Sequence, residues 1–271
     1  MTVARLVLVP MGAALLRLLS ALGRRGEAIL DHAASLATLT VKIFVHAARG
    51  RISLHDFAVQ CYTMGVQSLP IIVMTAALSG LVTTQQGGYQ FTGAIPLYVL
   101  GSVVVNSMVL ELGPVVSAFV FIGRVGARIT AELGTMKVSE QIDAFHALGR
   151  DPIGVLGAPR VLAGIVVFPV LVAIANIVGI YSGMIAAEVS VGLGSEAFWY
   201  GARLFWHRWN LVYSLGKGFA FGLAIPLIAV HMGLRTSGGA QGVGRSTTQS
   251  VVFMTVTLLV LDALFPPLFL D

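Results

Sequence analysis

Two long stretches without a charged side chain constrain this chain more than any other feature. No Asp, Glu, Lys or Arg occurs from Phe57 to Leu110 or from Val161 to Ala187, and a third uncharged run covers Gly218 to Leu234. A helix that crosses a bilayer needs about 20 predominantly apolar residues. Only 11% of the 271 residues are charged, against about 25% in soluble domains. The runs therefore predict an all-α, polytopic membrane protein.

The uncharged run 57–110 is too long for one span and suits two spans joined by a short turn. The turn is predicted at Gln85–Pro96, where Gly-Gly, Pro and polar residues break a helix. Extending the same reasoning along the chain predicts five spans, near 65–84, 97–123, 161–187, 213–233 and 248–269.

The basic residues predict the orientation of these spans. With a cytoplasmic N-terminus, fourteen of the seventeen Lys and Arg residues fall on the cytoplasmic side, as the positive-inside rule requires. The other three, Arg203, Arg208 and Lys217, fall in an outer loop or at the start of the fourth span. The C-terminus is then expected outside. This distribution accounts for the net charge of +5, so we expect no nucleic-acid partner.

The N-terminal segment resembles a signal peptide only superficially. Leu6–Leu16 is apolar and lies between Arg5 and Arg17, but no A-x-A cleavage site follows. A helix that lies in the cytoplasmic interface fits this pattern better. We therefore divide the chain into N-terminal interfacial or elbow helices (1–60) and a transmembrane domain (61–271).

Charged residues become frequent after Gly123, so 124–160 is predicted to be a solvent-exposed cytoplasmic loop. Within it, Ser139–Leu148 is predicted to be helical because apolar residues recur every three positions and Gly149 follows. On the other side of the membrane, the loop 188–212 contains all three tryptophans. These residues suit interfacial anchoring, and a specific partner contact is the alternative.

The sequence contains no pattern that predicts catalysis or metal binding by this chain. Its six histidines are scattered, it has one cysteine, Cys61, and it lacks an HExxH pair. Gly239–Thr247 imitates a phosphate-binding loop, but Arg245 replaces the lysine and the segment follows a membrane span instead of a strand. We therefore expect no ATP site, no metal and no cofactor in this chain, and no enzymatic activity.

Two carboxylates, Glu111 and Asp262, fall inside predicted spans. A charge at the bilayer centre costs about 2.5–3.5 kcal/mol on insertion scales, so neither should face lipid tails. Glu111 precedes Gly113 and Pro114, which predict locally irregular backbone. Glu111 is therefore either part of a polar wall or gate, or a structural carboxylate paired with a neighbouring helix. For Asp262 the structural interpretation is favoured.

Several motifs occur in an ordered series along the chain. They are ELGPVV from Glu111, GRVGARITAELG from Gly123, SEQIDA from Ser139, Asp151-Pro152, GVGRSTT from Gly242, and Leu261-Asp262. This series, which covers roughly residues 60–270, resembles the MlaE/YrbE family of ABC-type transporter permeases. Relatives often have Arg immediately before the acidic residue that matches Glu111, whereas this chain has Leu110.

The resemblance implies a homodimeric permease of the bacterial inner membrane that moves phospholipids or related lipids between membranes and supports outer-membrane lipid asymmetry. Cytoplasmic ABC ATPase subunits would bind the ATP and Mg²⁺, and a periplasmic MCE-domain protein would bind on the outer face. A small STAS-type subunit is a further accessory of such systems. Glu111 would lie near the lipid cavity, with Leu110, Pro114 and Asp262 as further candidates. The resemblance also implies a coupling helix that docks on the ATPase, with these members: Ser139, Glu140, Gln141, Ile142, Asp143, Phe145, His146 and Leu148.

Two other functions are compatible with parts of the sequence. A stand-alone secondary transporter or channel would use Glu111 and Asp262 as ion-coupling groups. An intramembrane lipid enzyme would need clustered His, Asp or Ser side chains, and the sequence shows no such cluster.

Overall fold

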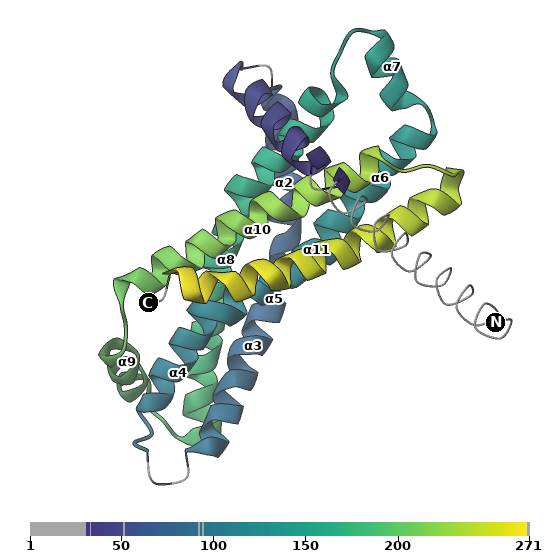
Figure 1. Cartoon of the computed structure of the whole chain (residues 1–271). Helices are drawn as coiled ribbons and strands as arrows, with labels where there is room; N and C mark the ends of the chain where they lie inside the picture. The colour runs from purple at the N-terminus through teal and green to yellow at the C-terminus, as the bar shows by residue number, and fades with distance from the viewer. Residues whose placement is uncertain (1–30, 33, 51, 92, 94, 270–271) are drawn as a thin grey trace, which may run out of the picture.

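A computed structural model describes residues 31–269 apart from 33, 51, 92 and 94, and these residues form helices without any strand. The predicted interfacial segment Leu6–Leu16 lies outside the described residues. Within them, five helical segments are long and apolar enough to cross a membrane (Figure 1). They are Leu54–Gln90, Val99–Val138, Ile153–Val191, Arg208–Leu234 and Gly239–Phe269. The predicted all-α, five-span architecture is confirmed, and a shorter apolar helix, Ala34–Ala48, precedes the first span.

Three of the spans contain irregular turns between their α-helices or at the ends of one. The first consists of α2 (Leu54–Met64), a 3₁₀ turn (Val66–Ser68) and α3 (Leu69–Gln90). The second consists of α4 (Val99–Ser107), α5 (Gly113–Phe121) and α6 (Ala127–Val138), joined by π turns at Met108–Leu112 and Ile122–Gly126. The third is α8 (Ala158–Ala186), with π turns at Ile153–Gly157 and Ala187–Val191. The others are α10 (Arg208–Leu234) and α11 (Gly239–Phe269), while α7 (Gln141–Ala147) and α9 (Ser195–Leu204) are short connecting helices.

Small residues let the spans approach closely around α8. Thr84 of α3 donates a hydrogen bond of 3.0 Å to the carbonyl oxygen of Gly183 in α8. On the other side of α8, a Cβ added to Gly222 of α10 would lie 2.5 Å from the carbonyl oxygen of Gly164. The four-residue spacing of Gly179 with Gly183 predicts such an approach, which is typical of membrane helices.

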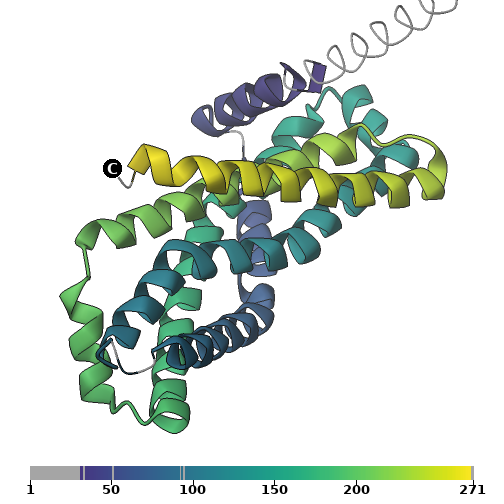
Figure 2. The same ribbon diagram turned by 60° about the horizontal axis from the view of Figure 1, so that its bottom comes forward.

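The core lies where α5, α8 and α10 meet. The rings of Phe121 and Phe168 are fully buried, with centroids 4.8 Å apart, and Phe221 of α10 is also buried in the same core. In contrast, α11 packs along α6 and α10 and leaves one long side open (Figure 2). Apolar residues on that side are about half exposed, for example Val256 and Leu259.

The prediction of a solvent-exposed loop at 124–160 is wrong over most of its length. Helix α6 continues the second span to Val138, and the third span begins at Ile153. Arg160 is buried, and its guanidinium lies 2.7 Å from Glu132 and donates to the carbonyl oxygen of Leu156. Pairing of the charged groups with one another and with backbone carbonyls allows helices to continue through this region. The outer segment 188–212 likewise contains helix α9.

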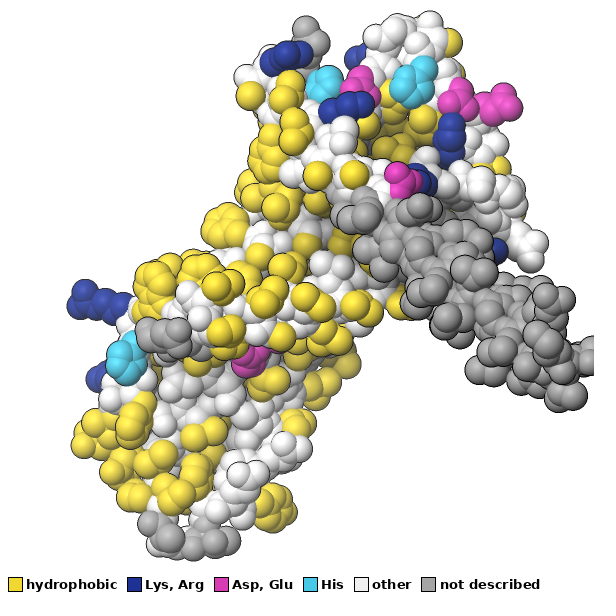
Figure 3. Space-filling model, in the orientation of Figure 1, with side chains coloured by type: hydrophobic (Ala, Val, Ile, Leu, Met, Phe, Trp, Pro, Cys, Tyr) yellow, Lys and Arg dark blue, Asp and Glu magenta, His cyan; other side chains and the backbone are white. Residues whose placement is uncertain are grey.

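Most of the charged side chains in view gather at one end of the molecule, and a few Lys or Arg and His side chains lie toward the other end (Figure 3). Figure 3 shows Lys, Arg, Asp, Glu and His over α7 and the neighbouring helix ends, while apolar side chains cover most of the long middle region. This distribution is typical of a protein whose middle lies in hydrocarbon and whose ends meet water.

Candidate functional site

The second span positions Glu111 at a break in its helix. Pro114 has no N–H group, so the carbonyl oxygen of Leu110, four residues earlier, receives no α-helical hydrogen bond from it. The backbone adapts with the π turn Met108–Leu112, in which the N–H of Gly113 donates to the carbonyl oxygen of Met108. π turns of this kind occur frequently at functional sites. The turn leaves the Leu110 carbonyl oxygen available to another helix.

The side chain of Lys217 in α10 reaches this carbonyl oxygen. This side chain is fully buried, and Nζ donates hydrogen bonds to Oε2 of Glu111 at 2.8 Å and to the Leu110 carbonyl oxygen at 3.1 Å. It also lies 5.0 Å from the centroid of the Tyr213 ring, within cation–π range. The ammonium therefore meets both the side chain and the free carbonyl of the irregular turn.

The third member of the cluster comes from the last span. Oδ1 of Asp262 in α11 lies 2.7 Å from Nζ of Lys217. Two carboxylates from different spans thus share one ammonium, and with all three groups ionised the cluster carries one net negative charge. Mutual pairing is how intramembrane charges are normally accommodated.

A polar face of α10 continues from Lys217 toward one end of the helix. Its members follow helical spacing of three and four residues, and each is buried: Asn210, Tyr213, Ser214 and Lys217. Asn210 donates to Oδ1 of Asn106 in α4 at 2.9 Å, and Ser214 accepts from Nδ2 of Asn176 in α8 at 2.9 Å. This face joins the second, third and fourth spans by polar contacts inside the bundle.

Gly113 brings the irregular turn against α8. A Cβ at this position would overlap Oδ1 of Asn176 and lie 2.8 Å from the carbonyl oxygen of Met108. Oδ1 of Asn176 is buried and accepts no hydrogen bond from the described residues. The glycine therefore sets how closely the turn that carries Glu111 approaches the third span.

The cluster is open on one side. The side chains of Glu111 and Asp262 are 46% and 21% exposed, whereas Lys217 has no exposed surface. Figure 3 shows a small acidic surface among the apolar side chains of the middle region of the molecule. A carboxylate exposed in such a region is costly against lipid tails. The arrangement fits a polar wall that contacts a second protein surface or the polar part of a ligand.

The structure brings together three of the four predicted cavity residues. Leu110, Glu111 and Asp262 all contact Lys217, and Pro114 is buried immediately beside them. Lys217 was expected in the outer loop or at the start of the fourth span, and it lies in the first half of α10; its pairing with Glu111 and Asp262 was not predicted. The signal that could have identified it is the series of polar residues at helical spacing that precedes it in an otherwise apolar span.

The predicted coupling helix is helical at Gln141–Ala147, and Lys137 of α6 pairs with Asp143 at 2.8 Å. It lies beyond α6 (Figure 1), at the end of the molecule where Figure 3 shows most of the charged side chains. Ile142 is buried within the chain, whereas the side chain of Leu148 is 75% exposed. Leu148 is therefore accessible to a partner, whereas Ile142 is not. A substitution at Ile142 would disturb packing within this chain and would not test a contact with a partner.

A second polar contact ties the helix Ala34–Ala48 to the start of the third span. Nε2 of His46 lies 3.0 Å from Oδ2 of Asp151, whose Oδ1 accepts from the N–H of Ile153 at 3.0 Å. Burial tends to raise the pKa of Asp151, but the hydrogen bonds from Ile153 and His46, with the charges of His46 and Lys42, lower it below its ordinary value of 3.8. In the part of the chain that the structure describes, no three His, Cys, Asp or Glu side chains are grouped so that they could hold a metal ion.

Comparison with known proteins gives consistent matches over most of the chain. The sequence profile of a family described as "Permease MlaE" matches residues 57–267. A probable ABC transporter permease protein of Synechocystis sp. is 35% identical over 222 residues, which cover 82% of this chain and 84% of that protein. A probable ABC transporter permease protein of Rickettsia prowazekii is 36% identical over 210 residues, 78% of this chain and 81% of that protein.

A plant protein is also similar. The chloroplastic protein TRIGALACTOSYLDIACYLGLYCEROL 1 of Arabidopsis thaliana is 32% identical over 228 residues, which cover 84% of this chain and 65% of that protein.

Proposed function

Because this chain belongs to the MlaE permease family, we propose that it is the membrane-spanning subunit of an ABC-type transporter that moves phospholipids or related lipids between membranes. The family and the five apolar spans support a transport role in a membrane. The Arabidopsis relative carries the name of a diacylglycerol glycolipid, which favours a lipid as the substrate.

The cluster of Lys217, Glu111 and Asp262 is the observation that carries this proposal. It places three charges from three spans in the apolar region, with Glu111 about half exposed. Lipid tails are a poor environment for this carboxylate, whereas a phospholipid headgroup offers donors, acceptors and charge. We assign the open side of the cluster to the wall of a lipid cavity that two copies of the chain form together.

The second span provides a route from an ATPase to this wall. Helix α7 is tied to α6 by the Lys137–Asp143 pair, and α6 continues through a π turn into α5, which begins beside Glu111. A displacement of α7 would therefore move α6 and α5 together. The π turns at Ile122–Gly126 and Met108–Leu112 are the two places where this span can bend. In this proposal, closure of cytoplasmic ATPase subunits, which bind ATP and Mg²⁺, reshapes the cavity through this span.

The remaining components follow from the same proposal. The transporter lies in the bacterial inner membrane with the N-terminus of this chain in the cytoplasm and the C-terminus outside. An MCE-domain protein receives or delivers lipid on the outer face, and a STAS-type subunit accompanies the ATPase. This chain performs no bond chemistry.

Reconstitution tests the proposal directly. The chain would be purified with the proteins that accompany it, incorporated into sealed vesicles with fluorescent phospholipid, and assayed for lipid transfer with and without ATP. We expect transfer that needs both ATP and a nucleotide-binding partner. Transfer by the isolated chain, without nucleotide or partner proteins, would refute the proposal.

A stand-alone secondary transporter is the alternative that the paired carboxylates favour, because intramembrane Glu and Asp residues serve ion coupling in such proteins. The same vesicles discriminate between the two functions. Substrate movement driven by a proton or sodium gradient, unaffected by ATP, would support the alternative and contradict an ATP-powered permease.

The coupling role of α7 has its own test. Leu148→Asp places a charge on an exposed apolar position at the end of α7 and should abolish ATP-dependent transfer while leaving membrane insertion unchanged. Leu54→Asp is a matched control, because Leu54 is 82% exposed and lies outside α7. Normal ATP-dependent transfer by the Leu148→Asp variant would show that Leu148 makes no contact that coupling requires.

A further inference from the structure

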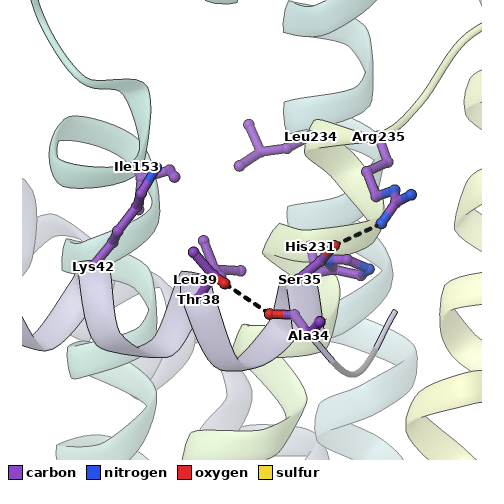
Figure 4. A pocket seen from close by; sticks show the side chains of 9 residues that line it. All are labelled: Ala34, Ser35, Thr38, Leu39, Lys42, Ile153, His231, Leu234 and Arg235. Atoms are coloured by element: carbon purple, nitrogen blue, oxygen red, sulfur yellow. Dashed lines mark hydrogen bonds between the residues drawn. The ribbon is translucent and has the colours of Figure 1, made fainter. Parts of the chain in front are cut away.

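A cavity in the described part of the chain lies away from the cluster at Lys217, where the helix Ala34–Ala48 crosses the ends of two spans. Its volume is about 460 Å³. Figure 4 shows that one wall is the helix Ala34–Ala48 and that the other walls come from Ile153 at the start of the third span and from the end of α10. A space of this size is in the range of small-molecule sites.

The cavity combines an apolar floor with cations at its two ends. Leu39, Leu234 and Ile153 provide the apolar surface, while Lys42 lies beside Ile153 and Arg235 lies at the opposite end (Figure 4). The residues between the cations add hydroxyl groups and a buried imidazole: Ser35, Thr38 and His231. Such a surface matches an amphiphile with an anionic, hydrogen-bonding head.

Little negative charge competes for these cations. Arg235 donates to Ser35 at 3.1 Å and lies 3.4 Å from Asp31, whose side chain is 73% exposed. Lys42 has no carboxylate within ion-pair distance in the described part of the chain, and the nearby Asp151 carboxylate is engaged by His46 and the N–H of Ile153. Exposed ion pairs such as Asp31–Arg235 contribute little, so an anion can displace the carboxylate.

The helix that forms the wall exposes apolar side chains. Among its outward residues, Val41, Phe44 and Val45 are 62%, 44% and 38% exposed. A short helix that exposes apolar side chains beside the ends of membrane spans is typical of the interface. A helix at the interface would bring the cavity close to lipid headgroups and would let acyl chains continue into the bilayer.

We propose that this cavity binds an anionic glycerophospholipid of the surrounding leaflet, with its phosphodiester between Lys42 and Arg235 and its glycerol region against Leu39 and Leu234. Basic pockets between spans and interfacial helices are known lipid-headgroup sites. The bound lipid joins the helix Ala34–Ala48 to the start of the third span and the end of the fourth. This site is separate from the proposed transport cavity, so lipid binding here does not depend on the proposed function.

Native mass spectrometry of the delipidated protein tests this site. The protein would be titrated with phosphatidylglycerol and with phosphatidylcholine of identical acyl chains, as wild type and as the Lys42→Gln/Arg235→Gln double variant. We expect the wild type to prefer phosphatidylglycerol and the double variant to bind it roughly 25-fold more weakly, about fivefold for each cation. Arg203→Gln/Arg208→Gln is the matched control, since it removes two positive charges near the other end of α10 and should keep the preference.

Two further measurements separate the alternatives. Thr38→Trp fills the cavity without changing charge and should also lower binding of phosphatidylglycerol, while inorganic phosphate at millimolar concentration should not displace the lipid. Complete displacement by phosphate would show a simple anion site and overturn the proposal. Equal phosphatidylglycerol binding by the double variant and its control, both eluting as folded protein, would overturn it as well.

Discussion

Replacement of Lys217 by Met gives the most informative perturbation of the ion cluster. Met has nearly the same length and removes only the ammonium, which is fully buried and contacts Glu111 at 2.8 Å and Asp262 at 2.7 Å. The two carboxylates, each in contact with the same Nζ, are within about 5.5 Å of each other, so their repulsion is roughly 3 kcal/mol at an effective dielectric constant near 20.

This value agrees with the cost of about 3–5 kcal/mol for removing one partner of a buried pair. The lower end applies, because Glu111 is 46% exposed and can be partly rehydrated. A loss of about 3 kcal/mol would lower the melting temperature by roughly 6–12 °C in a chain of this size. This shift can be measured by heating the protein in lipid nanodiscs and determining the folded fraction that remains by size-exclusion chromatography.

Two controls make the result specific. Lys137→Met removes an ammonium at the same 2.8 Å from a carboxylate, but that pair is exposed and should contribute about 1 kcal/mol or less. The Lys217→Met/Glu111→Gln/Asp262→Asn triple variant removes all three charges and should recover most of the lost stability. A Lys217→Met protein as stable as wild type, or a triple variant no more stable than the single one, would show that the cluster is not coupled as described.

Three further predictions concern other contacts. Gly113→Ala should destabilise the fold by about 1–3 kcal/mol through overlap with Asn176. Gly123→Ala is the control and should be tolerated, because the space around its added Cβ is open. Equal melting temperatures of the two variants would contradict this packing. Thr84→Val removes the hydroxyl that donates to the Gly183 carbonyl and should lower the stability by about 0.5–1.5 kcal/mol. The same unfolding assay measures this loss. An unchanged stability would show that this hydrogen bond does not stabilise the pair of helices. Because the native pKa of Asp151 is lowered, the stability that its charge provides should be fully present above about pH 4 and be lost as the pH falls through the native pKa. The difference in melting temperature between wild type and Asp151→Asn should therefore disappear at low pH, and a difference that grows on acidification would contradict the assigned direction.

The sequence by itself determined the class of protein, the number of spans and their approximate positions. This was possible because the cost of leaving charged side chains in hydrocarbon acts on every residue of a span, so uncharged runs such as Val161–Ala187 identify it without knowledge of its neighbours. The ordered motifs from Glu111 to Asp262 also identified the family. The same reasoning failed between 124 and 160, where ion pairs and carbonyl contacts such as those of Arg160 let helices continue through charged sequence.

Only the tertiary structure decided how the charges inside the spans are combined. Glu111, Lys217 and Asp262 lie on three different helices, and a hydropathy average over a span does not reveal which face of a helix a side chain occupies. Their contact depends on the rotation of α10 that its buried polar face imposes, and on the close approach that Gly113 allows beside Asn176. Those are properties of packing between distant segments, so local sequence could indicate that a charge in the membrane needs a partner but could not identify that partner as Lys217.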